Sequence, residues 1–536
     1  MRKHILIWLN FAVIFLLIEG RKGDNTAGPC KPGKNIDSAE NMYIDEDSIT
    51  GGRIDCVNGT AGIYPCKNVA LESYVPIKAL NHGEPSIAND LWGWTSNDGR
   101  EFALIGLFDG VGFVEITDSI NPKILGKIPS HTTSTFWRDI KTYQDHAYIV
   151  SDVKGHGMQV FDLTNLLNAS SFETYTIFSP TVHYSDFGRA HNIFINEETG
   201  FAYVVGSNKC DSGLYMINIT SPSNPTFAGC YADSGYVHDV QCVLYNGPDS
   251  EHGGKEICFA SNELEVDIID VSDKQNSVLL STFQYVDEEY THQGWLTEDK
   301  NYFLIDDELD EYNGEENTKT FICDVTDLDN PVWLGTYTAQ SRSIDHNQYV
   351  RGNFVYQANY QSGLRILGLD FISMGILFEV GYFDTYPEDN TNEFSGAWSN
   401  YAYFDSGVVI VSDIERGLFV VRPRLQSRAS EFEPSLEENF PLCPDGNKAY
   451  LNVSIEVNES NDQISLHQNL RYITANQTKW IALNDANWIA NDNTYVWGEC
   501  LDRDWCLNFH IFFEELKRNC CNDATVVFSI DFEGKS

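Results

Sequence analysis

Ile344-Asp345-His346-Asn347 is one of four similar stretches in this chain, each of which places a histidine and a polar residue at the start of an extended segment. The other three are Arg189-Ala190-His191-Asn192, Tyr236-Val237-His238-Asp239 and Tyr290-Thr291-His292-Gln293. Successive histidines are separated by 47, 54 and 54 residues. A repeat with a nearly fixed period of this size is typical of a propeller or a solenoid.

The repeat extends beyond the four histidines in both directions. Earlier copies begin at Asp90-Leu91-Trp92 and Phe136-Trp137-Arg138, and a later copy begins at Phe394-Ser395-Gly396, so that there are seven copies. Short runs rich in β-branched and aromatic residues alternate with turn signals, such as the Asn-Pro pairs at 121–122, 224–225 and 330–331. Four short strands in about 50 residues, without a long helical period, describe one propeller blade. The sequence therefore predicts an all-β fold with a seven-bladed β-propeller.

The two ends of the repeat array predict how the ring closes. The seventh copy contains only three runs and stops at Arg422-Pro423. The missing fourth run precedes the first copy, at residues 69–77, and its pattern of residue types matches that of residues 124–129. We expect this N-terminal strand to complete blade seven, because joining the ends of the chain in one sheet protects the sheet edges.

Several motifs, taken in order, resemble the choice-of-anchor B proteins, which carry LVIVD-type propeller repeats. The motifs are Cys56-Val57-Asn58-Gly59-Thr60, Pro65-Cys66-Lys67-Asn68-Val69, Asp90-Leu91-Trp92-Gly93-Trp94, Trp137-Arg138-Asp139-Ile140-Lys141, Gly155-His156-Gly157-Met158-Gln159 and Ala190-His191-Asn192. The resemblance covers residues 56–424. It implies a secreted or surface-attached protein, and it carries over no established reaction.

The composition indicates an acidic protein. Lys and Arg number 35 against 78 Asp and Glu, which gives a formal net charge of −43. This balance argues against nucleic acid or an anionic membrane as partner, because phosphate binding needs clustered Lys and Arg. The simplest interpretation is a solvated surface that keeps a secreted protein soluble.

The N-terminus has the pattern of a signal peptide, with Arg2 and Lys3 before an apolar stretch from Ile5 to Ile18. That stretch is short for a membrane span, so we expect export and no span after its removal, with an uncleaved anchor as the alternative. Beyond the propeller, an acidic segment leads to alternating strands and clustered cysteines. The predicted parts are a signal peptide at 1–20, an N-terminal Cys-containing segment at 21–68, the propeller at 69–424, an acidic linker at 425–441 and a small disulfide-rich β-sandwich domain at 442–536.

If the protein is exported, disulfides and N-linked glycans are expected. There are 13 cysteines, so at least one is free or pairs with another chain. Three pairs are suggested by their positions within one loop or one blade: Cys56 with Cys66, Cys210 with Cys230, and Cys242 with Cys258. Acceptor sequons for N-glycosylation stand at Asn58, Asn168, Asn218, Asn452, Asn458 and Asn476.

The repeat histidines are the main candidates for a functional site. The first strand of each blade lines a propeller's channel, so His191, His238, His292 and His346 should occupy four consecutive places around it, flanked by Arg138 and Gly396. Imidazole is a suitable ligand for a divalent metal such as Zn, and the ring's second nitrogen needs an acceptor. The next repeat position adds candidate polar binding residues, which are Asp139, Asn192, Asp239, Gln293 and Asn347.

A structural role for these histidines is the competing interpretation. A histidine at a repeat position can bond the backbone of the neighbouring blade, and four rings spread around a seven-fold channel need not converge on one ion. His156, in a Gly-His-Gly turn, is a further candidate for the channel rim, with a structural role in the turn as the favoured interpretation. The acidic run 306–317 has oxygen ligands suited to Ca, but it lacks the spacing of an EF-hand loop, which favours a solvated loop.

These features predict two function classes. The favoured one is an extracellular binding scaffold that recognises a protein or a glycan, because propeller loops surround a rigid ring. The alternative is a metal-dependent enzyme, a hydrolase or an oxidoreductase, that uses the channel histidines. The sequence contains no Gly-x-Ser-x-Gly elbow, no His-Glu-x-x-His and no phosphate-binding loop.

Overall fold

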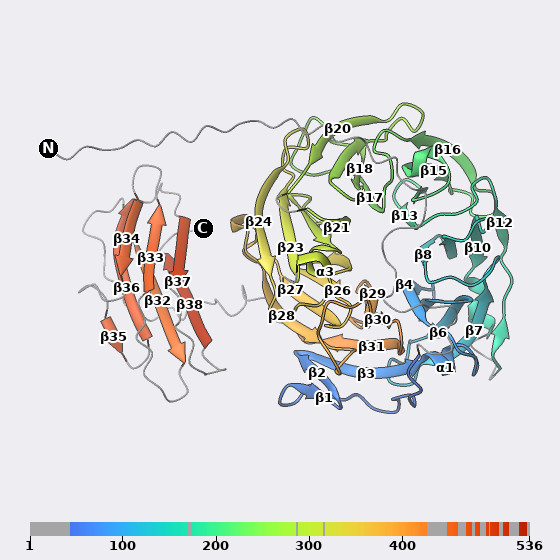
Figure 1. Ribbon diagram of the computed structural model, residues 1–536, viewed down its shortest axis with the longest axis horizontal. Helices are drawn as coiled ribbons and strands as arrows, with labels where there is room; N and C mark the ends of the chain where they lie inside the picture. Colours follow the sequence, from blue (N-terminus) through green and yellow to red (C-terminus); the bar gives the residue numbers. More distant parts are fainter. Residues whose placement is uncertain are drawn as a thin grey trace. The chain divides into compact units, whose positions relative to one another are not determined.

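The computed structural model describes residues 43–169, 174–285, 288–314 and 317–425 in full, and the backbone of seven strands between residues 448 and 532. The chain divides into two compact units, 1–432 and 433–536. The first unit contains the propeller. In it, the described residues form seven sheets arranged around a ring (Figure 1).

Blades one to three follow each other along the chain. Blade one holds β4 (Ala88–Thr95), β5 (Glu101–Leu107), β6 (Gly110–Glu115) and β7 (Lys123–Pro129). Blade two holds β8 (Arg138–Tyr143), β9 (His146–Ser151), β10 (Met158–Asp162) and β12 (Val182–Tyr184). Blade three holds β13 (Asn192–Asn196), β14 (Phe201–Val205), β15 (Leu214–Asn218) and β16 (Thr226–Tyr231).

Blades four to six repeat the same antiparallel order. Blade four holds β17 (Asp239–Leu244), β18 (Glu256–Ser261), β19 (Val266–Asp270) and β20 (Val278–Phe283). Blade five holds β21 (Thr291–Leu296), β22 (Tyr302–Asp307), β23 (Lys319–Asp324) and β24 (Val332–Thr338). Blade six holds β25 (Asn347–Arg351), β26 (Phe354–Ala358), β27 (Leu364–Gly368) and β28 (Phe378–Phe383).

Blade seven confirms the predicted closure of the ring. It contains β29 (Ala397–Tyr401), β30 (Val409–Asp413) and β31 (Gly417–Pro423), and its outer strand is the N-terminal β3 (Val69–Pro76). The pairing of β3 with β31 is antiparallel and runs from Val69 opposite Pro423 to Pro76 opposite Gly417. The two strands lie side by side in Figure 1. Residues far apart in the sequence thus share one sheet.

Several short strands and helices are added to the seven four-stranded blades. The pair β1 (Thr60–Ala61) and β2 (Tyr64–Lys67) extends blade six, and β11 (Thr176–Ile177) adds a parallel strand to blade one. The helices α1 (Ile77–Leu80), α2 (Thr164–Ala169) and α3 (Asp310–Gly314) are short, and single 3-10 turns occupy Cys210–Ser212 and Ile372–Met374. The insertion that contains α2 and β11 separates the third and fourth strands of blade two.

The hydrophobic core lies between the faces of adjacent blades. Phe259 of blade four stacks on Phe303 of blade five, with 5.0 Å between ring centroids, and both rings are buried. On the other face of blade five, Leu304 and Ile322 pack with Val355 of blade six. Alternate residues of one strand therefore serve two inter-blade layers, which explains the nearly continuous apolar runs in the sequence.

The three disulfides predicted for this part of the chain are present: Cys56–Cys66, Cys210–Cys230 and Cys242–Cys258. Cys242 and Cys258 face each other across β17 and β18. Among the described propeller residues, Cys323 is buried and forms no disulfide. The first disulfide also joins the segment before β3 to the sheet, because Cys66 pairs with Phe383 of blade six.

The second unit is described through its strands alone. One sheet has the order β35-β36-β32-β38, from Ile489–Asn491, Thr494–Asp502, Lys448–Asn458 and Thr525–Phe532. The other has the order β34-β33-β37, from Thr478–Ala482, Gln468–Ile473 and Asn508–Phe513. The expected signal peptide at 1–20, the acidic linker from residue 426 onward and the cysteine pairing of the second unit lie outside the described residues.

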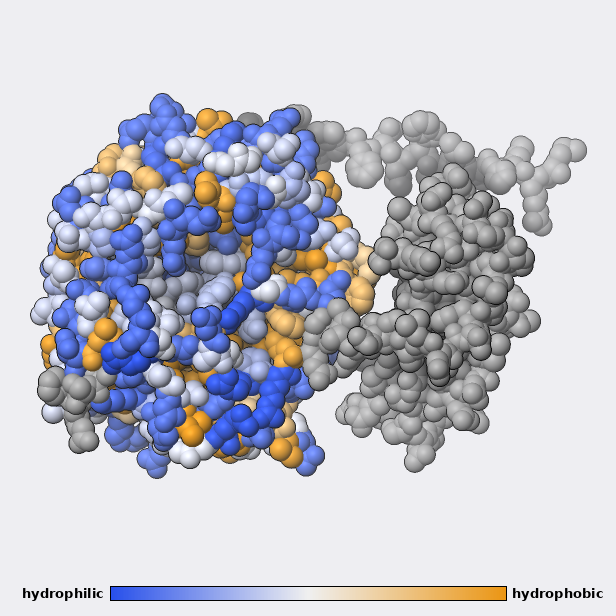
Figure 2. Space-filling view, turned by 180° about the vertical axis from the view of Figure 1, so that it is seen from behind, coloured by the Kyte–Doolittle hydropathy of each residue, from blue (hydrophilic) through white to orange (hydrophobic). Residues whose placement is uncertain are grey.

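The surface of the propeller is polar on the face seen in Figure 2, where hydrophilic residues predominate and apolar residues are scattered among them. Among the sequon residues, Asn58 and Asn168 are exposed, whereas Asn218 is half-buried and accepts a hydrogen bond from Thr220 Oγ1 at 2.7 Å. Asn452, Asn458 and Asn476 belong to the part whose side chains are not described. No helix in the described residues is long and apolar enough to span a membrane.

Candidate functional site

The seven inner strands surround the channel, and each is in contact with the next, from β4 through β8, β13, β17, β21 and β25 to β29 and back to β4. The four repeat histidines stand at or next to the first residue of β13, β17, β21 and β25. Their ring centroids are 4.3, 4.2 and 4.4 Å apart in succession, so they form a continuous row. All four line a cavity of about 20 Å³, which has room for a water molecule or a single ion.

In each of the four histidines, Nδ1 bonds an acceptor of the protein. His238 Nδ1 lies 3.0 Å from the backbone oxygen of His292, and His346 Nδ1 lies 2.5 Å from that of Trp398. A carbonyl oxygen can only accept, so Nδ1 carries the proton in both rings. This is the inter-blade backbone bonding that the structural interpretation predicts. In the neutral ring it also leaves the Nε2 lone pair without a proton.

His292 Nδ1 bonds a buried carboxylate instead, with 2.9 Å to Asp306 Oδ1. That carboxylate also accepts the backbone N–H of Gln293 on Oδ1 and the side-chain amide of Gln348 on Oδ2. Burial raises the pKa of Asp306, while the Gln293 amide opposes the rise. A carboxylate that holds the proton on Nδ1 is the usual outer partner of a metal-bound imidazole.

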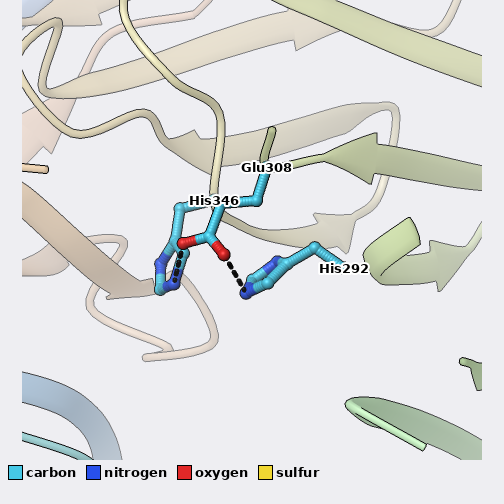
Figure 3. A group of neighbouring side chains, drawn as sticks. All are labelled: His292, Glu308 and His346. Atoms are coloured by element: carbon cyan, nitrogen blue, oxygen red, sulfur yellow. Dashed lines mark ion pairs between the residues drawn. The ribbon is translucent and has the colours of Figure 1, made fainter. Parts of the chain in front are cut away.

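The Nε2 atoms of two rings face the buried carboxylate of Glu308, which lies between them in Figure 3. His292 Nε2 is 3.9 Å from Glu308 Oε2, and His346 Nε2 is 3.6 Å from Glu308 Oε1. These separations are too long for hydrogen bonds. They approach the separation of about 3.3 Å between ligand atoms that follows from a tetrahedral shell with bonds of 2.0–2.1 Å.

Both of these imidazoles are neutral. Burial lowers the pKa of His346 to about 3, and burial together with the neighbouring histidines lowers that of His292 well below its usual range. Neutral rings protonated on Nδ1 present lone pairs to Glu308, which also accepts a hydrogen bond from the Tyr360 hydroxyl at 2.8 Å. Three acceptor groups thus face one another, and a cation between them could be bound by all three.

The other two histidines of the row have different surroundings. Burial lowers the pKa of His238 well below its usual range, whereas His191 is raised because Asp152, 3.1 Å from its Nδ1, offsets the effect of burial. Gly206 fits closely against His191: its φ is +59°, and a Cβ there would lie 2.5 Å from the histidine Cβ. His191 and His238 line the cavity without joining the group around Glu308.

Most of the predicted polar residues act as links between blades. The side-chain amides of Asn192, Gln293 and Asn347 donate to backbone oxygens of the next blade, at His238 (3.0 Å), Gln348 (3.0 Å) and Trp398 (3.2 Å). Asn192 and Asn347 also line the cavity, and Gln293 does not. Each amide thereby satisfies a buried carbonyl at a blade junction, which is a structural function.

Asp139 and Asp239 belong to the acidic side of the cavity. Lys141 Nζ lies 2.5 Å from Asp139 Oδ1 and 3.2 Å from Asp90 Oδ2, and all three side chains are buried. Burial would raise the pKa of Asp139, but the Lys141 ammonium and several donors hold it below its usual range. Burial and the charge of Asp139 raise the pKa of Asp239 to about 7. The cavity thus has histidines on one side and an ion-paired carboxylate cluster on the other.

His156 does not line this cavity. It is buried, and its Nε2 lies 3.1 Å from Arg138 Nη1. The turn that carries it places the ring against Arg138 of blade two, at the first residue of β8.

The acidic run 306–317 is the largest departure from the sequence-based expectation. A solvated loop was expected, but Asp306, Asp307, Glu308, Asp310 and Glu311 are all buried. The run leaves β22, bends through α3 and turns its carboxylates inward. Glu308, the residue that faces two of the histidines, was not singled out from the sequence. Its only signal was its place in this unusually acidic insertion.

Solved structures similar to this chain include a protein from Lactobacillus plantarum, 13% identical over 61% of this chain and 88% of that chain with a TM-score of 0.39. The periplasmic gluconolactonase of Pseudomonas aeruginosa is 10% identical over 56% and 85%, with a TM-score of 0.39. The C-terminal WD40 domain of Sif2 is 10% identical over 67% and 91%, also with a TM-score of 0.39. No family model and no curated protein matches the chain. Likeness at this level carries no argument about function, which must come from the site itself.

Proposed function

We propose that this protein is an extracellular propeller of the choice-of-anchor B type whose channel binds one divalent transition-metal ion. His292 Nε2, His346 Nε2 and the Glu308 carboxylate are the ligands. Two imidazoles and one carboxylate form a ligand set that suits Zn²⁺, and the Asp306 and Trp398 acceptors behind the two rings supply the outer contacts that such ligands need.

One observation carries this proposal: the neutral rings of His292 and His346 direct acceptor nitrogens at a buried carboxylate, at distances of 3.9 and 3.6 Å. Two imidazole nitrogens and a carboxylate that converge in this way are the arrangement of acceptors that a divalent cation binds. A divalent ion converts the same contacts into three metal–ligand bonds.

The size of the cavity favours a binding role over an enzyme. Three protein ligands leave one coordination position open, as in catalytic zinc sites. The adjoining space of about 20 Å³ accepts a water molecule but no organic substrate. We therefore propose that the ion stabilises the ring, and that loops around it serve as a scaffold for an extracellular protein or glycan. A metal-dependent hydrolase or oxidoreductase is the second candidate, favoured by the open coordination position.

Export is part of this proposal. Three disulfides in the first unit suit an oxidising compartment. The exposed Asn58 and Asn168 suit glycosylation, and the net charge of −43 suits a secreted protein without a nucleic-acid partner. For residues 442–536 we propose a disulfide-rich β-sandwich, supported by the two sheets and the clustered cysteines.

The test is the metal content of the full-length protein. The chain is expressed through a secretory route, stripped with a chelator, reconstituted with ZnCl₂ and measured by elemental mass spectrometry. We expect one Zn²⁺ per chain in the wild type, and a loss of at least tenfold in affinity in His292→Ala and in His346→Ala. His146→Ala, which removes an imidazole outside the channel, serves as the matched control and should keep the metal.

Two results would contradict the proposal. One is a folded wild-type protein that binds no transition metal at equimolar concentration. The other is a His292→Ala/His346→Ala variant that keeps the full zinc content, since the ion would then reside elsewhere.

A further inference from the structure

We infer that Asp310, Glu311 and Asp345 form a second cation site, built entirely from carboxylates and suited to Ca²⁺. It lies in the inward-turned acidic run, beside the histidine group but separate from it. The inference is independent of the channel metal, because it uses none of the three proposed zinc ligands.

The three carboxylates converge in the interior of the protein. Asp310 and Glu311 come from α3 and Asp345 from the segment before β25, and one oxygen of each lies within 4.8 Å of the others. Their side chains are almost fully buried, with exposures of 4%, 0% and 1%. The distances match a Ca²⁺ shell, in which bonds of 2.3–2.6 Å place opposite oxygens at most about 5 Å apart.

Several of these oxygens lack a hydrogen-bond partner, which is the second observation behind the inference. Both oxygens of Asp345 and Glu311 Oε2 are buried with no donor in bonding geometry. The other Glu311 oxygen accepts the backbone N–H of Lys319 at 3.1 Å. Buried carboxylate oxygens without donors are rare in folded proteins, because each has lost its water without replacement.

The nearby positive charge does not balance the cluster. Lys319 Nζ lies 3.3 Å from Asp310 Oδ2 and neutralises one carboxylate of the three. Two of the three carboxylates therefore remain to be compensated. Buried carboxylate oxygens without donors, as in Asp345 and Glu311, are compensated by a proton or by a bound cation. An all-oxygen set of this kind selects hard cations such as Ca²⁺ or Mg²⁺, and Ca²⁺ accepts irregular geometry more readily.

The position of the cluster connects it to the channel. Asp345 precedes His346 directly, and Asp310 follows Glu308 by two residues. A Ca²⁺ ion held by Asp310, Glu311 and Asp345 would fix the two segments that present Glu308 and His346. Occupancy of the acidic site should therefore strengthen zinc binding in the channel, and by reciprocity zinc should strengthen Ca²⁺ binding.

The experiment uses full-length protein stripped with chelator and then titrated with CaCl₂ at pH 7 and constant ionic strength. Calorimetry should detect one Ca²⁺ per chain, and the unfolding temperature should rise by roughly 3–4 °C when Ca²⁺ exceeds its Kd a hundredfold. Asp345→Asn and Glu311→Gln keep the shape of the side chains and should lose both responses. Both variants must also keep the circular dichroism spectrum of the wild type, so that a lost response is not explained by misfolding.

The controls separate this site from general attraction of cations and from the channel. Asp329→Asn removes a carboxylate of a more exposed group and should keep the full Ca²⁺ response. His292→Ala should lose zinc and keep Ca²⁺. The inference is overturned if the wild type responds to Ca²⁺ no more than Asp345→Asn does. It is also overturned if Asp345→Asn is more stable than the wild type with saturating Ca²⁺ present, because protons would then be the native counterions.

Discussion

Arg138 donates a hydrogen bond to the ring of His156, with 3.1 Å between Arg138 Nη1 and His156 Nε2. A guanidinium has no acceptor, so His156 Nε2 must be unprotonated. Its Nδ1 lies 3.0 Å from the backbone oxygen of Gly157 and carries the proton. Both ring nitrogens are thus satisfied only in the neutral form.

This contact predicts a loss of stability in mild acid. Burial and the charge of Arg138 lower the pKa of His156 to about 3, whereas an unfolded histidine titrates near 6.5. Between these values the unfolded chain binds more protons, so the contribution of His156 is complete above about pH 6.5 and is lost as the pH falls toward 3. His156→Gln should show a smaller decrease in unfolding free energy between pH 7 and pH 5 than the wild type in urea titrations. Equal decreases in His156→Gln and in the wild type would refute the assignment of a neutral His156. His146→Gln is the control and should behave like the wild type.

The strand that closes the ring should be among the most sensitive elements to truncation. Leu71 of β3 is fully buried and packs in the layer between blades six and seven. Leu71→Ala should lower the free energy of unfolding by about 2–5 kcal/mol. Val278→Ala, at a side chain that is 56% exposed, should change it by less than about 0.5 kcal/mol. A comparably small effect at Leu71 in denaturant titration would mean that β3 contributes little to closure.

The fold was predictable because its information is repeated in the sequence. Seven copies of one pattern fix the strand order, and the short last copy points to residues 69–77 as the missing strand. Disulfides within a blade were predictable for the same reason, since Cys242 and Cys258 sit on consecutive strands. The row of four histidines also followed from the repeat position.

The composition of the site was only partly predictable. Glu308 belongs to an insertion found in one blade, so no repeat position marked it, and its burial depends on how α3 turns back into the ring. The roles of Asn192, Gln293 and Asn347 as blade links rather than ligands depend on backbone oxygens of neighbouring blades. A sequence pattern records which side chains recur, but not which carbonyls remain to be satisfied.

The buried ion cluster of the cavity predicts a strong effect at Lys141. Its ammonium contacts Asp139 and Asp90, and Lys141→Met would leave both carboxylates buried without it. We expect a loss of about 3–5 kcal/mol in unfolding free energy. Asp90→Asn/Lys141→Met should recover part of that loss, because one of the uncompensated charges is removed as well. The idea fails if this double variant is no more stable than Lys141→Met alone.

The cross-strand disulfide of blade four predicts a moderate effect. Cys242 and Cys258 are 16 residues apart in sequence, and closing a loop of this length restricts the unfolded chain. Replacing both by Ala should reduce the unfolding free energy by about 3 kcal/mol in non-reducing buffer. Adding a reducing agent should then lower the free energy of unfolding of the variant less than that of the wild type. A loss below about 0.5 kcal/mol would show that strand pairing alone holds the two positions.

Glu308→Gln should change the stability in opposite directions with and without metal. In chelator, an amide at position 308 can donate to His292 Nε2 or His346 Nε2, which a carboxylate cannot do, and it removes a buried charge. The variant is therefore expected to be more stable than the stripped wild type by about 1–3 kcal/mol. With zinc present the order should reverse, because an amide oxygen is a weaker ligand than a carboxylate. A variant that is less stable under both conditions would indicate that Glu308 is held by protein contacts alone, such as the bond from Tyr360.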